Sequence, residues 1–588
     1  MAKKKIDYTD WTKEDLVKEI TRIKETTYGL VWHRDVPQEK IDVIINSDAR
    51  TPEEVFSNEV SGKPFPVLKS VKTKDIYVGP AELNHILIEG DNYHALAVLN
   101  FTHSEQIDLI YIDPPYNTGN SDFIYNDKYV DKEDSFRHSK WLSYIEKRLK
   151  LAKNLLKRSG VIVISIDDHE QAPLKMLCDE IFGGKNFVAC LPTVMNLKGN
   201  PDTIGFTETH EYTLVYAKDK SLATFNQFDV DEETLESEWD EDEFGLYKKA
   251  DTLRRTGQDA SRKRRPRGWF PVFIDIERQR CYVTENDIPA NKKHFVLYPI
   301  NKEGDELSWT WGKKKITDES HNLIITGKGQ KLNIYKKQRP RLGDLPTQKP
   351  KSILYKPEYS TSTATNHLKS ILGSKKFDGP KPVPLIMDLL FVAGSKNALI
   401  LDFMAGSGTT AEAVLRLNKI DDGSRRYILA TNNENNIIED VTHPRLKNVI
   451  KGYKDSRRSE VEGLGGNLKY FTAYDFVESE PTDKNKRKLV KKSTEMLCIK
   501  EGVYDLVAET DEYKILKNPQ DKYMGVIFYE DAIPAFKNEL SKIKHKVNTY
   551  VFSLGDDPHR AEFKDVKNKV VLQPIPDVIL RVYREIFK

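Results

Sequence analysis

The chain has 588 residues, and its 92 lysine and arginine residues nearly balance 90 acidic ones, giving a formal net charge of +2. This length exceeds what one hydrophobic core organises, so we expect several domains. The balance excludes a uniformly basic protein, and any nucleic-acid surface must come from locally segregated charge. No stretch approaches the uncharged apolar length of a membrane span, and the N-terminal stretch MAKKKIDYTDWTKED lacks the apolar core of a signal peptide. We therefore expect a cytoplasmic protein without a membrane partner.

Cysteine and histidine spacing bears on metal sites. The histidines show no metal-ligand spacing, and the four cysteines lie far apart without a Cys-x-x-Cys pair, at Cys178, Cys190, Cys281 and Cys498. This pattern argues against both a zinc site and a disulfide framework, and we predict no metal.

The N-terminal segment, residues 1–80, is predicted to be accessory. Within it, residues 12–24 have the apolar periodicity of an amphipathic helix, and Thr12 can serve as its N-cap.

Strand and helix signals alternate over residues 81–219. Helical periodicity covers 141–157 and stops at Gly160, while apolar runs typical of strands occur at 85–92, 107–112, 161–168 and 210–219. Strands that are apolar on both faces and alternate with helices predict a parallel α/β sheet.

The alternation breaks at about 220–376 and resumes at 377–477, so we infer one sheet that is split by an insert. The resumed part predicts a helical segment at 380–394, a strand at 397–403, a glycine loop, a helix at 411–418 and a strand at 426–433. The polar stretch 478–490 predicts a linker, and residues 490–588 predict a small separate α/β domain.

The tetrapeptide Asp113-Pro114-Pro115-Tyr116 follows directly after a predicted buried strand. Ligands of α/β sheets lie beyond the carboxyl ends of strands, which places this loop for catalysis. Two prolines stiffen the loop and leave the Pro114 carbonyl free to accept a hydrogen bond beside the Asp113 carboxylate. Such paired acceptors suit the exocyclic amine of a nucleobase, and Tyr116 offers a stacking face for a flipped base. The alternative is an ordinary Pro-rich turn.

The second signal is a glycine loop, Asp402 to Thr410, between a strand and a helix. Glycines let the backbone approach a ligand beside a helix N-terminus, so we expect a nucleoside cofactor. The Lys of a P-loop is missing, but Gly406, Gly408 and Ala411 satisfy the looser pattern of dinucleotide enzymes. An NAD-dependent oxidoreductase is therefore the alternative from another class. The Asp-Pro-Pro-Tyr loop argues against it, because hydride transfer needs no paired acceptors.

The third signal is a basic cluster in the insert, which follows an acidic stretch at 229–243 and has Trp269 and Phe270 alongside. Arginines neutralise phosphates and bind guanine edges, so DNA recognition is predicted here; the alternative is a solvated charge run. The cluster comprises Arg254, Arg255, Arg262, Lys263, Arg264, Arg265 and Arg267.

Five motifs in this order, HILIEGDNYHAL, YIDPPYNTG, GVIVISIDD, FDGPKP and LDFMAGSGTT, resemble those of the β-class amino methyltransferases of DNA. The length and the N-terminal style are similar to the modification subunits of type III restriction systems. In that class the catalytic half precedes the cofactor half, with the target-recognition region between them. The resemblance covers roughly residues 80–450.

The resemblance implies a seven-stranded, doubly wound, Rossmann-like methyltransferase sheet, permuted in sequence. It comprises a catalytic half (81–219), a target-recognition region (220–376), a cofactor half (377–477) and a C-terminal α/β domain (490–588). The implied activity is methylation of adenine N6 in double-stranded DNA, with S-adenosylmethionine as cofactor. A homodimer and a helicase-nuclease restriction subunit are the implied partners. Cytosine-N4 methylation, and a DNA-binding protein on an inactive methyltransferase fold, are further alternatives.

The resemblance also assigns site residues. Asp113, Pro114, Pro115 and Tyr116 would hold adenine, Asp91 would lie near the adenine of the cofactor, and Lys381 would lie beside its methionine end. Thr431 stands where many relatives carry an acidic residue for the ribose, so Glu434 is the substitute. The methionine part would be held by Asp402, Phe403, Ala405, Gly406, Ser407, Gly408, Thr409 and Thr410.

Overall fold

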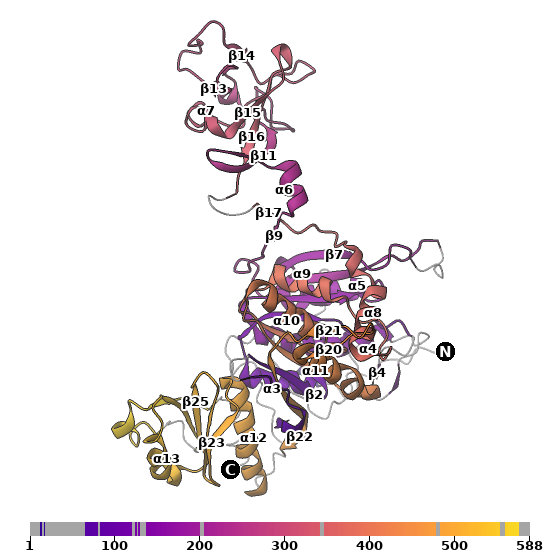
Figure 1. Ribbon diagram of the computed structural model, residues 1–588, viewed down its shortest axis with the longest axis vertical. Helices are drawn as coiled ribbons and strands as arrows, with labels where there is room; N and C mark the ends of the chain where they lie inside the picture. Colours follow the sequence, from indigo (N-terminus) through magenta and orange to yellow (C-terminus); the bar gives the residue numbers. More distant parts are fainter. Residues whose placement is uncertain are drawn as a thin grey trace. The chain divides into compact units, whose positions relative to one another are not determined.

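The computed structural model describes residues 12–14, 17, 65–79, 83–119, 124–125, 128–129, 137–199, 205–340, 346–477, 483–552 and 559–575. Most of the predicted helix 12–24 and the last apolar segment of the chain lie outside these residues. The described residues form two compact units, one up to Asn226 and from Lys351 onward, the other Gln227–Pro350 (Figure 1). The inserted unit is therefore shorter at both ends than the predicted 220–376.

The first unit is built on one nine-stranded sheet. Strands β22 and β1 lie beyond β2 and add to the run from β2 to β7, so the expected number of seven is wrong. The strand order is β1 (Phe65–Ser70), β22 (Asn467–Val477), β2 (Asn84–Glu89), β19 (Arg426–Thr431), β18 (Leu399–Asp402), β3 (Ile107–Ile112), β6 (Leu156–Ile166), β8 (His210–Ala217) and β7 (Phe187–Val194).

The sheet is mixed rather than wholly parallel. Neighbouring strands from β22 to β6 run parallel. The end strands β1, β8 and β7 pair antiparallel to their neighbours. The continuous apolar runs correctly predicted that the strands are buried on both faces. They could not predict whether neighbouring strands run parallel or antiparallel, because both directions allow the same burial.

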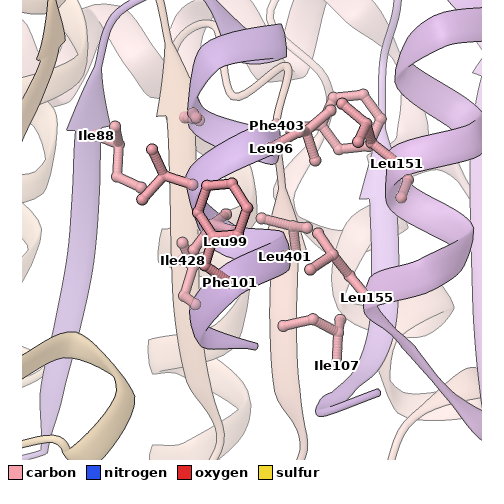
Figure 2. Packing of buried hydrophobic residues seen from close by; sticks show 14 of the residues in the cluster. Ile88, Leu96, Leu99, Phe101, Ile107, Leu151, Leu155, Leu401, Phe403 and Ile428 are labelled. Carbon is pink, nitrogen blue, oxygen red and sulfur yellow. The ribbon is translucent and has the colours of Figure 1, made fainter. Parts of the chain in front are cut away.

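Helices cover both faces because alternate side chains of each strand point to opposite sides. Ile110 and Ile162 belong to one core, whereas Leu109 and Val161 belong to the other. Figure 2 shows leucines of α3 and α4 lying against strand residues such as Ile88, Leu401 and Ile428. The first core includes α3 (Asn92–Thr102), α4 (Arg137–Leu155), α5 (Gln171–Cys178) and α12 (Asp483–Glu501); the second includes α8 (Thr361–Leu372), α9 (Val383–Ala393), α10 (Thr409–Asp421) and α11 (His443–Lys451).

Two predicted boundaries differ from the structure. Helix α4 ends at Leu155 and β6 begins at Leu156, four residues before the predicted stop at Gly160. The predicted linker 478–490 contains the first turns of α12, which begins at Asp483. Its buried Leu489 and Met496 join the core of the large sheet, as do Met524 and Val526 of the C-terminal part. Other C-terminal residues, such as Ile515 and Phe536, form a cluster of their own.

The C-terminal part adds a five-stranded sheet within the first unit. Its strands, in spatial order, are β23 (Asp505–Glu509), β24 (Tyr513–Lys517), β25 (Tyr523–Ile527), β26 (Val547–Val551) and β27 (Val570–Leu572), and α13 (Ile533–Leu540) packs beside them. Two small hairpins complete the unit: β4 (Ile124–Tyr125) with β5 (Lys128–Tyr129), and β20 (Gly452–Lys454) with β21 (Glu460–Glu462).

The inserted unit has its own small core, which includes Leu253, Phe270, Trp309 and Ile334. A four-stranded sheet orders β10 (Asp240–Asp242), β11 (Gly245–Thr252), β16 (Asn333–Gln338) and β15 (Leu323–Thr326), and a three-stranded one orders β13 (Arg280–Tyr282), β12 (Val272–Asp275) and β14 (Phe295–Leu297). The strands β9 (Phe228–Asp229) and β17 (Thr347–Gln348) pair where the chain enters and leaves the unit, and its helices are α6 (Glu232–Glu238) and α7 (Lys313–Asp318).

Candidate active site

The two loops singled out in the sequence leave neighbouring strands at the same edge of the sheet. Strand β18 pairs in parallel with β3, with Leu401 opposite Ile110. The tetrapeptide follows β3 and the glycine loop follows β18. Residues almost 300 positions apart in the sequence therefore meet at one edge, as expected for a ligand site of an α/β sheet.

Asp113 has a buried carboxylate oxygen. Its side chain is 29% exposed, but its Oδ1 is buried and accepts no hydrogen bond from the residues that the structure describes. Burial raises the pKa of the carboxyl group, and the nearby Lys381 partly opposes this. A buried acceptor without a hydrogen bond is uncommon in folded proteins, and here the Lys381 ammonium at 3.4 Å supplies only an ion-pair contact, so a ligand can still donate to Oδ1.

A charged cluster surrounds the tetrapeptide. Lys381 Nζ lies 2.6 Å from Glu211 Oε2 and 3.4 Å from Asp113 Oδ1. The Tyr116 hydroxyl donates to Glu211 Oε2 at 2.9 Å and accepts from Lys381. Although burial lowers the pKa of Lys381, Asp113 and Glu211 raise it above its ordinary value, so the ammonium stays charged. The structure thus places Lys381, predicted beside the cofactor, in contact with Asp113 and Tyr116.

Glu211 was missed by the sequence analysis. It lies in the stretch His-Glu-Tyr at the start of β8, which was recognised only as a strand. An acidic residue at the start of an otherwise apolar strand was the available signal.

Trp141 restrains the tetrapeptide from the α4 side. Its side chain is fully buried and its Nε1 donates to the Pro115 carbonyl at 2.7 Å. The Pro114 carbonyl, in contrast, accepts no hydrogen bond from the described residues. The two groups that the sequence analysis paired, the Asp113 carboxylate and the Pro114 carbonyl, are both open to a donor.

The glycine loop has the backbone conformation of a ligand cradle. Gly406 and Gly408 have φ angles of +47° and +79°, a region that L side chains rarely adopt. Asp402 is buried and accepts from the Met404 amide at 2.9 Å and from the Thr410 hydroxyl at 2.5 Å. Burial raises the pKa of Asp402 to about 7. The loop enters α10 at Thr409 without a side-chain cap, which leaves amide donors at the helix N-terminus.

Phe403, predicted among the residues that hold the cofactor, has its side chain in the protein core. It is fully buried in the core between α3, α4 and the sheet, as Figure 2 shows. Its neighbour Ala405 is 7% exposed and belongs to the opposite core. At these two positions only the backbone can face a ligand, because the alternation along the chain turns the side chains into the protein.

A buried ion pair between Arg445 and Glu412 contacts the glycine loop. Arg445 of α11 donates to Glu412 of α10 at 2.9 Å, to the Ser407 hydroxyl at 3.0 Å and to the Thr409 hydroxyl at 2.9 Å. Although burial raises the pKa of Glu412, Arg445, His367 and Arg416 hold it well below its ordinary value. Sequence patterns did not reveal this pair, since both residues sit on helices whose charged positions looked like solvent-exposed faces.

A cavity of about 490 Å³ lies beside the glycine loop. Glu434 lines it together with Lys376, Phe377, Asp378, Asn435, Ile437, Asp440 and Val441. The Phe377 ring reaches within 3.9 Å of the position that a Cβ on Gly406 would take. This volume falls in the range of small-molecule sites. The predicted Glu434 therefore lies on the same cavity wall as Phe377.

Asp91 already accepts hydrogen bonds from other residues of the protein. It is the N-cap of α3, where its Oδ1 accepts from the Tyr93 amide at 2.6 Å and from Arg148 at 3.2 Å, and the side chain is 47% exposed. Thr431 ends β19 and is 8% exposed. Neither residue contacts the glycine loop through a bond between described residues.

The basic cluster of the insert divides into paired and unpaired residues. Arg262 pairs with Glu306 at 2.9 Å and Arg264 with Asp259 at 2.8 Å, and neither partner belongs to the acidic stretch 229–243. The exposed Lys263, Arg265 and Arg267 form no ion pair with any described residue, whereas Arg254 and Arg255 are half-buried. Phe270, which lies beside the cluster in sequence, is 4% exposed and fills the core of this unit.

Among the described residues, no group of three His, Cys, Asp or Glu side chains could hold a metal ion. The four cysteines are free thiols. No described helix is both long enough and apolar enough to cross a membrane.

Comparison with solved structures gives low overall similarity. A complex of M1.HpyAVI with SAM is 13% identical, with a TM-score of 0.27, over 62% of this chain and all of that chain. The PvuII DNA methyltransferase, which is cytosine-N4-specific, is 11% identical, with a TM-score of 0.31, over 63% of this chain and 89% of that chain.

Sequence comparison gives the family. A model described as DNA methylase matches residues 107–440. The EcoPI Mod subunit of a type III restriction-modification enzyme from Escherichia phage P1 is 51% identical over 431 residues, 68% of this chain and 67% of that protein. The type II methyltransferase M.KpnI of Klebsiella pneumoniae is 34% identical over 388 residues, 63% of this chain and 89% of that protein. The chain belongs to the DNA methylase family and is similar to the Mod subunits of type III restriction-modification systems.

Proposed function

We propose that this DNA methylase transfers a methyl group from S-adenosylmethionine to N6 of adenine at specific sites of double-stranded DNA, as the modification subunit of a type III system. The observation that carries the proposal is the buried Asp113 Oδ1, which accepts no hydrogen bond from the described residues and has only an ion-pair contact with Lys381 at 3.4 Å, together with the Pro114 carbonyl, which also accepts none. The 51% identity to the EcoPI Mod subunit supports the choice of system.

The tetrapeptide would activate and hold the amine. An adenine amine has two N–H groups, one for the Asp113 carboxylate and one for the Pro114 carbonyl, since Trp141 already occupies the Pro115 carbonyl. Accepting both hydrogen bonds favours a pyramidal nitrogen with an available lone pair. Each such preorganised contact is worth about 2.7–4 kcal/mol in the transition state. The Tyr116 ring, fixed through its hydroxyl by Glu211 and Lys381, would stack on the flipped base.

The residues of the glycine loop fit a nucleoside cofactor. The positive φ of Gly406 and Gly408 brings the backbone close to a ligand, and the uncapped start of α10 offers donors. Asp402 to Thr410 would hold its methionine part, while Asp91 and Glu434 would lie near the adenosine. S-adenosylmethionine bound there supplies an electrophilic methyl group on a sulfonium. Asp113, which directly follows β3, would stabilise the positive charge that develops on the amine nitrogen as it attacks the methyl group.

The inserted unit would supply target recognition. Its exposed Lys263, Arg265 and Arg267 have no acidic partner among the described residues, which suits contact with phosphates. Arg254, Arg255, Arg262 and Arg264 remain candidates for the same surface. We further propose a permuted methyltransferase sheet, because the strand with the glycine loop follows the strand with the tetrapeptide in sequence and pairs with it in space.

Association with a second copy and with a restriction subunit belongs to the same proposal. The printed name of the EcoPI relative supports a place in a type III system. The C-terminal sheet from β23 to β27 is the candidate mediator, and light scattering of the chain with and without a restriction subunit measures both associations.

Single-molecule sequencing of DNA from cells that express the chain tests the reaction. We expect N6-methyladenine in one sequence context and none in cells that express the Asp113→Ala variant. N4-methylcytosine in place of N6-methyladenine would overturn the choice of base. Calorimetric titration that gave tight NAD binding and no response to S-adenosylmethionine would overturn the choice of cofactor in favour of an oxidoreductase.

A further inference from the structure

The residue after the tetrapeptide, Asn117, holds an unusual backbone conformation. Its φ is +58°, in the left-handed region where asparagine is enriched among non-glycine residues. The side chain is fully buried. Its Nδ2 donates to Glu170 Oε1 at 2.5 Å, while its Oδ1 has no hydrogen-bond partner among the described residues. The Asn117 side chain is therefore held, among the described residues, by its hydrogen bond to Glu170.

Glu170 is itself buried and shared between two donors. It lies in the turn between β6 and α5, with no exposed side-chain surface. Its Oε1 accepts from Asn117 and is 2.6 Å from His138 Nδ1, whereas its Oε2 has no partner among the described residues. Burying a carboxylate is costly unless its donors hold it.

His138 connects this buried pair to the first turn of α4. Arg137 Nε donates to His138 Nε2 at 3.2 Å, so the ring Nδ1 carries the hydrogen and donates to Glu170. The His138 side chain is 47% exposed. One turn further along the same helix, Trp141 donates to the Pro115 carbonyl. The start of α4 thus restrains the catalytic loop at two points, directly at Pro115 and through Glu170 at Asn117.

We propose that Glu170 is a positioning residue for methyl transfer, which, oriented by His138, fixes Asn117 and so holds the Asp113 and Pro114 acceptors in register for the target amine. Neither residue has an assigned role, and both act through the loop rather than on the base. Reactive groups must be held to within a few tenths of an ångström, and misplacement by 1 Å can cost about 100-fold in rate. The inference rests on the proposed function.

Two pairs of variants at the linked positions test the inference, by radiolabelled methyl transfer from S-adenosylmethionine to plasmid DNA. Glu170→Gln keeps an acceptor oxygen and should retain kcat within about threefold, whereas Glu170→Ala should lose about 30-fold or more. His138→Asn places an amide nitrogen where Nδ1 stood and should retain activity, whereas His138→Leu should lose about tenfold. In each losing variant the KM for DNA should stay within about threefold, because phosphate contacts are untouched.

The control is His169→Asn. His169 precedes Glu170, but its ring Nδ1 pairs with Asp167 at 2.8 Å rather than with the loop, so this variant should match the wild type. Thermal unfolding checks folding, and His138 is exposed enough for its variants to report if Glu170→Ala does not fold.

Three outcomes would overturn the inference: full kcat in His138→Leu, equal losses in the Gln and Ala variants of Glu170, or a loss in His138→Asn that matches His138→Leu. Wild-type protein that methylates no DNA would instead overturn the proposed function. The two failures are therefore distinguishable.

Discussion

Three buried arginines of the first unit and two exposed arginines of the inserted unit have different roles. In the first unit Arg148, Arg425 and Arg445 are 2%, 1% and 1% exposed, and each forms an ion pair with a carboxylate of the same unit. In the inserted unit Arg265 and Arg267 are exposed and form no ion pair with any described residue. Buried guanidinium groups fix local geometry, since removing one leaves a buried charge uncompensated. Exposed ones contribute little to folding and remain available to a polyanion.

The largest expected effect is the loss of folding stability when a buried arginine is replaced. Arg445→Met leaves Glu412 buried without its main partner and should lower the free energy of unfolding by about 3–5 kcal/mol. Arg265→Met in the insert is the matched variant and should change it by less than about 0.5 kcal/mol. Urea unfolding of both proteins measures the difference. Equal losses of unfolding free energy in both variants would show that buried and exposed arginines contribute equally to stability.

Asp113→Ala should remove catalysis without removing recognition. Loss of one preorganised acceptor lowers kcat by about 100- to 1,000-fold. DNA affinity should stay within about tenfold, because the phosphate contacts proposed for the insert are intact. Methyl transfer and fluorescence anisotropy with labelled duplexes measure the two quantities. A parallel collapse of DNA affinity would contradict the assignment of chemistry to one unit and of recognition to the other.

Gly408→Val should weaken S-adenosylmethionine binding by about 10- to 100-fold, from backbone strain of about 1–3 kcal/mol. At this position φ is +79°, and a Cβ would meet Thr442 Cγ2 at 3.3 Å. Gly373, at the end of α8, has a φ of +78° with nothing within 4 Å of an added Cβ. Gly373→Val carries the same strain away from the loop, so calorimetry should show unchanged cofactor binding. Similar affinities of Gly408→Val and Gly373→Val for S-adenosylmethionine would show that the glycine loop does not bind the cofactor.

Among the exposed basic residues of the insert, those without an ion pair should contribute more to DNA binding than those with one. Replacing Lys263, Arg265 and Arg267 with Ala should reduce the slope of log K against log salt by up to about 0.9 per lost phosphate contact. Arg262 and Arg264 already have acidic partners, so their double Ala variant should change the slope less. If one of these arginines binds a guanine, its loss should cost about 1–3 kcal/mol on the cognate site alone. Wild-type slopes in both variants would mean that the cluster does not contact DNA.

The smallest effect is a shift of the pH profile. The ionised Asp113 is the acceptor, so the rate should fall as the pH drops through its pKa, which burial has raised above the ordinary value. The charge of Glu211 contributes to this rise. Glu211→Gln removes that charge and should move the acid limb of kcat to lower pH. A shift to higher pH would show that the loss of order around Lys381 outweighs the electrostatic effect.

Local sequence determined the parts of the site that depend on neighbours in the chain. The strand before Asp113, the two prolines and the glycines are short-range features, and the structure has the strand and the positive φ angles of Gly406 and Gly408 where they were expected. Periodicity also predicted α9, α10 and β19 to within a few residues. Their packing into two cores followed from strands that are apolar on both faces.

Only the tertiary structure decided which distant polar groups meet. Glu211, Glu170 and Arg445 lie far in sequence from the loops that they contact, and His138 lies far from Glu170. A single charged residue on a strand or helix carries no sign of its partner. The same holds for the mixed strand directions, for the nine strands, and for Phe403 and Phe270, whose burial depends on the elements packed against them. Propensity and periodicity act over a few residues, whereas pairing of charges and closure of a core are settled by contacts that form only when the chain has folded.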